Sequence, residues 1–124
     1  MNEVVRIECS GMDNAVRQVG DSWSMLILWE ALQGTTRFDN FQSLLGVARN
    51  ILSNRLAKLV DEGILVKRPI HSDARRLEYR VTGKGEALRP ALELIEGWGK
   101  HVSPLSAEPS TRPVLTTFGT RPSL

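Results

Sequence analysis

Apolar residues recur at helical spacing in the first part of the chain and predict two helices there. The first passes through Ala15, Val16 and Val19 to a glycine, with Ser10 or Asp13 placed to accept hydrogen bonds from its free N-terminal amides. The second covers residues 23–33; Asp21 or Ser22 can cap its N-terminus, and Gly34 ends it. Because this second segment is apolar on most of its sides, it is predicted to be the central buried helix.

Two further helices follow, and the second of them has an unusual polar face. Apolar residues at i, i+3, i+6 and i+7 predict a third helix from Phe38 to Gly46, and a fourth runs from Ala48 to Glu62 with a stripe of leucines on its core side. At 100° per residue, the positions that point away from the stripe are Asn50, Asn54, Ala57 and Lys58, with Arg49, Ser53 and Arg55 on the flanks. Asparagine is a mediocre helix former, so two on this face indicate a role in hydrogen bonding.

A ribbon and a last helix complete the predicted elements. Residues 64–70 and 77–82 have strand character, and the connection 71–76 places Arg75 and Arg76 at a basic tip. A helix from Lys84 to about Val102 follows, which Pro90 is expected to bend. The order of four helices, a ribbon and a helix predicts an α+β, mostly α fold, the winged helix-turn-helix, in which the third and fourth helices form the helix-turn-helix and the fourth lies in the major groove of DNA. The additional N- and C-terminal helices are expected to form a dimer seam.

Length and composition fit one globular domain. The chain has 124 residues, 41% hydrophobic and 24% charged, and no apolar run approaches the length of a membrane span. Residues 1–102 are predicted to form the DNA-binding domain, and residues 103–124, rich in proline, serine and threonine, a flexible tail. The N-terminus lacks the pattern of a signal peptide, so we expect a cytoplasmic protein without a membrane partner.

Positive charge is concentrated in one part of the chain. The net charge is only +2, but residues 49–76 contain seven lysines and arginines against three acidic residues. Such a local excess is expected where one face of a protein meets a polyanion, although a solvated face is an alternative explanation.

Several short motifs lie between residues 9 and 100. Each motif alone occurs in many winged-helix families, but their order and spacing together are specific for one family. They are Cys9, residues 19–28 (VGDSWSMLIL), Arg37-Phe38, residues 52–56 (LSNRL) with Leu59, residues 63–68 (GILVKR), residues 78–85 (EYRVTGKG), residues 88–90 (LRP) and Trp98-Gly99. Together they resemble the HxlR-type winged-helix transcriptional regulators of bacteria. The chain departs from the family where it has Asp21 and Ser22 in place of a glycine and a lysine, and Ala48 in place of a serine that would cap the recognition helix.

The resemblance implies a homodimer that binds an inverted repeat in double-stranded DNA as a sequence-specific transcriptional regulator. The candidate DNA-binding residues are Arg37, Arg49, Asn50, Ser53, Asn54, Arg55, Lys58, Arg75 and Arg76. The two asparagines can pair with adenine edges and Arg49 with guanine, whereas Arg55 and Lys58 are expected at phosphates.

The signal to which such a regulator responds is left open by the sequence. The resemblance suggests that Cys9 senses oxidants or electrophiles, and the alternative is a small residue retained for packing. A second hypothesis is a small-molecule pocket at the dimer interface lined by Trp23, Trp29 and Trp98, although tryptophans are also typical of a core or dimer seam. A hypothesis of another class is a winged helix that binds only proteins, which would show no steep salt dependence with DNA.

Enzymatic function is not indicated. The two histidines and one cysteine have no metal-ligand spacing, and neither a phosphate-binding glycine loop nor a nucleophile elbow occurs. No metal and no cofactor are therefore predicted.

Overall fold

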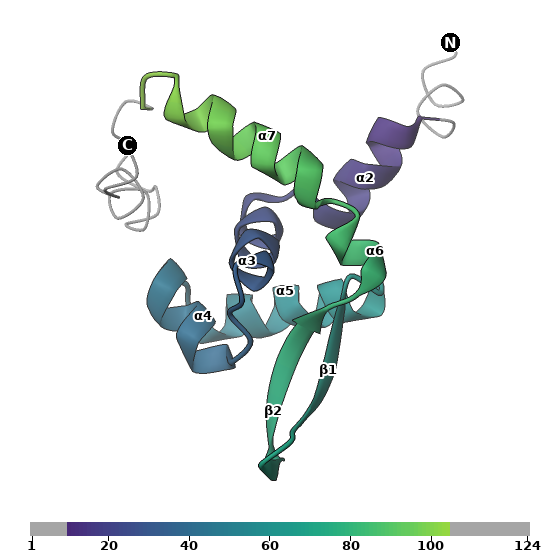
Figure 1. Ribbon diagram of the computed structural model, residues 1–124, viewed down its shortest axis with the longest axis vertical. Coiled ribbons are helices and arrows are strands. Elements are labelled where there is room, and N and C mark those ends of the chain that lie inside the picture. The colour runs from purple at the N-terminus through teal and green to yellow at the C-terminus, as the bar shows by residue number, and fades with distance from the viewer. Residues whose placement is uncertain (1–9, 105–124) are drawn as a thin grey trace.

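A computed structural model describes residues 10–104, which form a helical body from which a two-stranded hairpin projects (Figure 1). The elements are α2 (Gly11–Val19), α3 (Ser22–Leu32), α4 (Phe38–Leu45), α5 (Arg49–Asp61), β1 (Leu65–Ile70), β2 (Asp73–Val81), α6 (Gly83–Glu86) and α7 (Arg89–Lys100). This order confirms the predicted winged helix-turn-helix, with the hairpin as the wing. Cys9 and residues 105–124 of the predicted tail lie outside the described residues.

Side chains at the helix N-termini explain where the first helices begin. The Ser10 hydroxyl accepts a hydrogen bond from the Asp13 amide at 3.1 Å, and the Asp21 carboxylate accepts one from the Ser24 amide at 2.9 Å. Helix α5 begins after Ala48 without a side-chain cap, as the sequence predicts.

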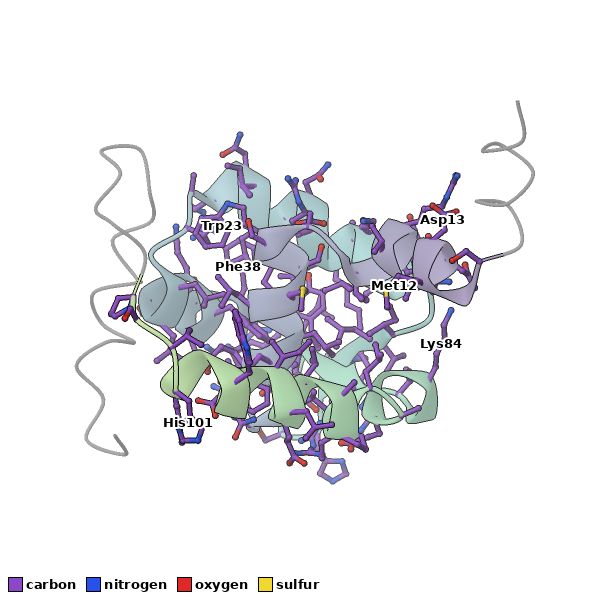
Figure 2. All side chains as sticks on the ribbon, turned by 90° about the horizontal axis from the view of Figure 1, so that it is seen from above. Met12, Asp13, Trp23, Phe38, Lys84 and His101 are labelled. Carbon is purple, nitrogen blue, oxygen red and sulfur yellow. The ribbon has the colours of Figure 1, made fainter. Side chains whose placement is uncertain are left out.

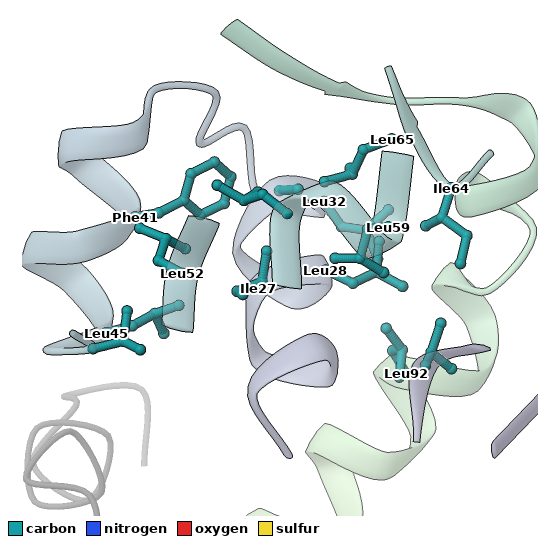
Figure 3. Packing of buried hydrophobic residues seen from close by; sticks show 14 residues of the cluster. Ile27, Leu28, Leu32, Phe41, Leu45, Leu52, Leu59, Ile64, Leu65 and Leu92 are labelled. Carbon is teal, nitrogen blue, oxygen red and sulfur yellow. The ribbon is translucent and has the colours of Figure 1, made fainter. Parts of the chain in front are cut away.

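The hydrophobic core surrounds α3, which the sequence predicts as the central helix. Ile27 and Leu28 are fully buried, and they pack with fully buried residues from α4, from α5, from β1 and from the position just before β1 (Figure 3). Those neighbours are Phe41, Leu45, Leu52, Leu56, Leu59, Ile64 and Leu65. Each such side chain stabilises the fold by roughly 1.5–3 kcal/mol through its removal from water, so the leucine face of α5 is firmly anchored and its opposite face is held in a fixed orientation.

The wing is longer than the sequence indicates. Strand β2 begins at Asp73, because Asp73 pairs with Ile70 across a tight turn at residues 71–72. The next pair is Leu77 with Pro69, so residues 74–76 lie in an irregularity of the ladder. The prediction that Arg75 and Arg76 belong to a connecting loop is therefore wrong, although both remain near the tip. Proline has no amide to donate, which explains a disturbed ladder at Pro69.

The predicted last helix is broken into two pieces rather than bent. Helix α6 ends at Glu86, and α7 begins at Arg89 with Pro90 in its first turn. Inside a continuous helix the ring of Pro90 would collide with the carbonyl group of Glu86, whereas in a first turn its missing amide costs nothing. Helix α7 also ends at Lys100, two residues before the predicted boundary.

The segment from α6 to α7 ties the ends of two other helices to the body. The Lys84 ammonium donates to the Glu62 carbonyl oxygen at 2.6 Å, after the end of α5. The Arg89 guanidinium donates to the Leu32 carbonyl oxygen at 3.0 Å, at the end of α3. Gly85 is needed for this packing, because a Cβ there would lie 2.6 Å from the carbonyl oxygen of Ile64. Helices α2 and α7 lie at the end of the molecule opposite the tip of the wing (Figure 1).

Candidate nucleic-acid interface

A tight turn sets the angle between the two helices of the helix-turn-helix. Helix α4 ends at Gly46, whose φ of 65° is in the left-handed region that favours glycine. Val47 follows and is only 3% exposed, so the turn is anchored in the core before α5 begins. The N-terminal half of α5 is thereby presented on the surface beside α4.

The polar face of α5 is exposed as the sequence predicts, with one difference. Asn50, Ser53, Asn54 and Ala57 are all exposed. Lys58 is half-buried instead, because its ammonium group turns toward the beginning of α3. Three hydrogen-bonding side chains therefore face solvent on successive turns of α5.

Three of the predicted DNA-binding arginines meet at one open hollow of about 380 Å³. Arg37 comes from the beginning of α4, Arg49 from the beginning of α5 and Arg76 from β2. The remaining lining residues are Phe38, Asp39, Asn40 and Leu77. Three arginines against a single aspartate make this hollow positive, which suits it to a phosphate group by charge. We call it the arginine hollow.

Contacts with α4 hold Arg49 in place at the arginine hollow. Its guanidinium carbon lies 4.6 Å from the centre of the Phe38 ring, in a cation–π contact. One of its terminal nitrogens donates to Gln42 Oε1 at 3.2 Å and lies 3.6 Å from Asp39 Oδ1. Arg49 is nevertheless 67% exposed, so its charge stays accessible from solvent.

The carboxylate of Asp21 links α3 to α5, the predicted recognition helix. Its Oδ1 accepts from Arg55 Nε at 3.1 Å, and its Oδ2 accepts from Lys58 Nζ at 3.4 Å. Ser24 donates to the same carboxylate from its amide and from its hydroxyl group. Burial raises the pKa of Asp21, but the hydrogen bonds from Ser24 and from Arg55 outweigh it and lower the pKa to about 2. Asp21 is therefore ionised at neutral pH and pairs with two predicted DNA-binding residues.

The wing carries further positive charge. Arg75 is 92% exposed and lies 3.5 Å from Asp73, beside the turn. On the strands, Glu78 pairs with Arg80 at 3.0 Å and approaches Arg68 at 4.0 Å. Tyr79 donates its amide to the Thr36 carbonyl oxygen at 2.7 Å, which attaches the wing to the segment before α4. This attachment brings Arg76 to the arginine hollow.

A pocket lined by Trp23, Trp29 and Trp98 at a dimer interface stays a prediction, because the structure describes a single chain. Trp23 and Trp29 on α3 are half-buried and pack against the core, whereas Trp98 on α7 is 68% exposed. Trp23 lies over the helical body in Figure 2, on the side of Phe38. The second open hollow, about 530 Å³, is lined by residues 33–37 and three residues of α4, without a tryptophan.

The sequence predicts a cap for α3 from the pair Asp21 and Ser22, of which Asp21 is the cap, but it does not predict the contacts of Asp21 with α5. The partners lie 34 and 37 residues further along the chain, so no local pattern reveals them. The one available signal was the acidic residue at a position where the related family has glycine.

The fold and this polar, basic surface define a DNA-binding protein of the winged helix-turn-helix class. No helix among residues 10–104 is long and apolar enough to cross a membrane. The chain belongs to the HxlR-like helix-turn-helix family, whose model matches residues 18–106.

Similar proteins are named as transcriptional regulators. Rv3095 of Mycobacterium tuberculosis, an uncharacterized HTH-type transcriptional regulator, is 38% identical over 99 residues, which are 80% of this chain and 63% of that protein. YvaP of Bacillus subtilis, named in the same way, is 34% identical over 91 residues, covering 73% of this chain and 84% of YvaP. The chain thus covers less than two thirds of the length of its mycobacterial relative.

Solved structures share the fold. The crystal structure of PA1607, a candidate transcription factor, has a TM-score of 0.72 at 41% identity and covers 81% of this chain and 71% of that one. The oxidized form of the redox regulator HypR has a TM-score of 0.71 at 20% identity, with 77% of this chain and 100% of that one covered. The likeness to HypR concerns the fold alone.

Proposed function

We propose that this chain is a sequence-specific transcriptional regulator that binds an inverted repeat of DNA as a homodimer. The observation that carries the proposal is the arginine hollow directly beside the exposed polar face of α5. A phosphate in the hollow fixes the register of the protein on the duplex, and the polar face of α5 then meets base edges in the major groove.

Base recognition is assigned to three side chains of α5. Asn50, Ser53 and Asn54 are exposed, and all carry groups that donate and accept hydrogen bonds. Amides suit the N6 and N7 atoms of adenine, while a hydroxyl suits several bases or a phosphate. Arg37, Arg49 and Arg76 contact phosphate from the hollow, and Arg75 contacts the backbone or the minor groove from the tip of the wing. For Arg49 this assignment replaces the guanine contact expected from the sequence, because contacts with Phe38 and Gln42 hold its guanidinium group at the hollow.

A homodimer is supported by apolar side chains that one chain leaves exposed at the end opposite the tip of the wing. Met12 on α2 is 73% exposed, and on α7 Leu94 is 76% and Trp98 68% exposed. Figure 2, which looks down on this end of the molecule, shows Met12 at the edge of α2 that faces α6 and α7. Exposed apolar side chains gathered on two helices are typical of a protein–protein contact. Pairing of two chains through α2 and α7 would leave both recognition helices accessible, since α5 lies outside this contact. Dimers of helix-turn-helix proteins bind half-sites about one helical turn, roughly 34 Å, apart.

The chain's single cysteine is the proposed sensor of the regulator. Cys9 lies outside the described residues, and support comes from the family resemblance alone. If Cys9 senses oxidants, a thiol oxidant such as diamide abolishes DNA binding by the wild type but not by Cys9→Ser. Equal loss in both proteins, or no loss in the wild type, would contradict this part of the proposal.

The experiment that tests the function is selection of duplexes from a random library with the wild-type protein. We expect enrichment of one sequence in two inverted copies, and weaker binding of it by Asn50→Ala. Asn14→Ala is the matched control, because Asn14 is also an exposed helical asparagine but lies on α2. Since α2 belongs to the proposed dimer contact, sedimentation verifies that this variant remains a dimer before its binding is compared. Absence of any enriched sequence, or equal losses in both variants, would refute sequence recognition by α5.

A further inference from the structure

Asp21 neutralises positive charge at the DNA-facing helix. Arg55 and Lys58 are each about one third exposed, and both lie within 3.4 Å of this single carboxylate. Four donors surround the two oxygens of Asp21, which is about as many as a carboxylate can accept. A phosphate that approaches either cation must therefore compete with an acceptor that is already in place.

Arg55 also connects Asp21 to a side chain predicted to contact bases. One of its terminal nitrogens donates to Asn54 Oδ1 at 2.9 Å, while its Nε donates to Asp21. A guanidinium group only donates, so the atom of the Asn54 amide that faces it must be the oxygen. The amide NH₂ group of Asn54 then points away from Arg55, ready to donate to an acceptor on a base.

We propose that Asp21 is a specificity-determining positioning residue of this DNA interface, an inference that rests on the proposed function. Its carboxylate withholds Arg55 and Lys58 from phosphates of any sequence. Through Arg55 it also fixes the orientation of the Asn54 amide. Both effects lower the affinity for random DNA relative to a preferred site, because phosphate contacts carry no sequence information and base contacts do.

The test is Asp21→Asn, which removes the charge but keeps an oxygen that caps α3. Binding is measured by fluorescence anisotropy at a series of salt concentrations, on a random-sequence duplex and on the duplex selected by the wild type. We expect random DNA to be bound more tightly, by about 3-fold per protomer and about 10-fold for a dimer, the range of an exposed ion pair. The salt dependence becomes steeper by about 0.9 for each cation released to a phosphate. The dissociation constant for random DNA divided by that for the selected duplex therefore falls.

Two further variants separate the proposal from a general effect of charge or folding. Asp13→Asn removes a carboxylate that pairs with Arg17 at 2.7 Å on α2. Because α2 belongs to the proposed dimer contact, sedimentation first verifies that this variant remains a dimer, and we then expect it to leave the ratio unchanged. Asp21→Ser also retains a capping oxygen, so it replaces Asp21→Asn if that variant folds poorly. Thermal unfolding of each variant verifies the fold before binding is measured.

The outcomes distinguish the inference from the function on which it rests. Unchanged affinity, salt slope and ratio in Asp21→Asn would overturn the inference, and so would a loss of affinity for both duplexes, because Asp21 would then help the cations to reach phosphate. If neither the wild type nor Asp21→Asn binds DNA at low salt, the proposed function itself fails.

Discussion

Replacement of Arg76 by glutamine is expected to flatten the salt dependence of DNA binding. Arg76 lines the arginine hollow, and its side chain makes no ion pair or hydrogen bond within residues 10–104. The substitution therefore removes a phosphate contact without breaking a contact of the folded protein. Each phosphate contact contributes about 0.9 to the slope of log K against log salt concentration, so a homodimer should lose about 1.8. Between about 50 and 200 mM salt, this slope difference corresponds to an affinity change of about 12-fold.

Fluorescence anisotropy with a random-sequence duplex at several salt concentrations measures this slope. Arg17→Gln is the matched control, since Arg17 is 69% exposed but lies on α2, where it pairs with Asp13. Sedimentation verifies that this variant remains a dimer, because α2 belongs to the proposed dimer contact. We expect its slope to equal that of the wild type. Equal slopes for the wild type and Arg76→Gln would refute the assignment of a phosphate to the hollow. Equal reductions in both variants would show that only net charge matters.

Three further predictions concern stability and assembly. Gly85→Ala should lower the free energy of unfolding, measured in urea, by about 1–3 kcal/mol, because the added Cβ overpacks the contact with Ile64. Gly97→Ala should raise it by up to about 1 kcal/mol, because an added Cβ there has no neighbour within 4 Å. A lower stability of Gly97→Ala than of Gly85→Ala would contradict the packing described. Leu94→Glu should convert the dimer to a monomer in sedimentation equilibrium, whereas Leu44→Glu, at an exposed apolar position of α4, should not. A dimer that persists in Leu94→Glu would exclude this part of α7 from the interface. Because the pKa of Asp21 is about 2 in the folded protein and near 3.8 without its partners, its charge stabilises the fold above pH 4 and ceases to do so as the pH falls toward 2. The wild type should exceed Asp21→Asn in stability by about 1 kcal/mol at pH 6, after allowance for solvent screening, and the difference should vanish near pH 2; a constant difference would disprove the linkage.

Local patterns in the sequence were sufficient for the helices of the body. The leucine stripe of α5 acts within a few helical turns, so its spacing predicts it. The caps were narrowed to two candidates each, Ser10 or Asp13 and Asp21 or Ser22, and the structure shows Ser10 and Asp21. The break before α7 was misjudged because Pro90 is compatible both with a bent helix and with the first turn of a new one. The early start of β2 depends on pairing with β1, which composition alone does not specify.

The candidate interface was predictable by residue type but not by arrangement. The exposure of Asn50, Ser53 and Asn54 follows from helical periodicity and the position of the core. The meeting of Arg37, Arg49 and Arg76 requires the wing to fold back on the segment before α4, through the hydrogen bond between Tyr79 and Thr36. Such contacts arise from tertiary packing.

The central claim is that the exposed face of α5 contacts base edges in the major groove at two symmetric half-sites. Methylation interference on the selected duplex tests it most directly, because dimethyl sulfate modifies guanine at N7, an atom that lies in the major groove. We predict two groups of interfering guanines, related by the symmetry of the repeat and about one helical turn apart. Interference at a single group, or modified guanines throughout the site without effect on binding, would contradict recognition by a pair of α5 helices.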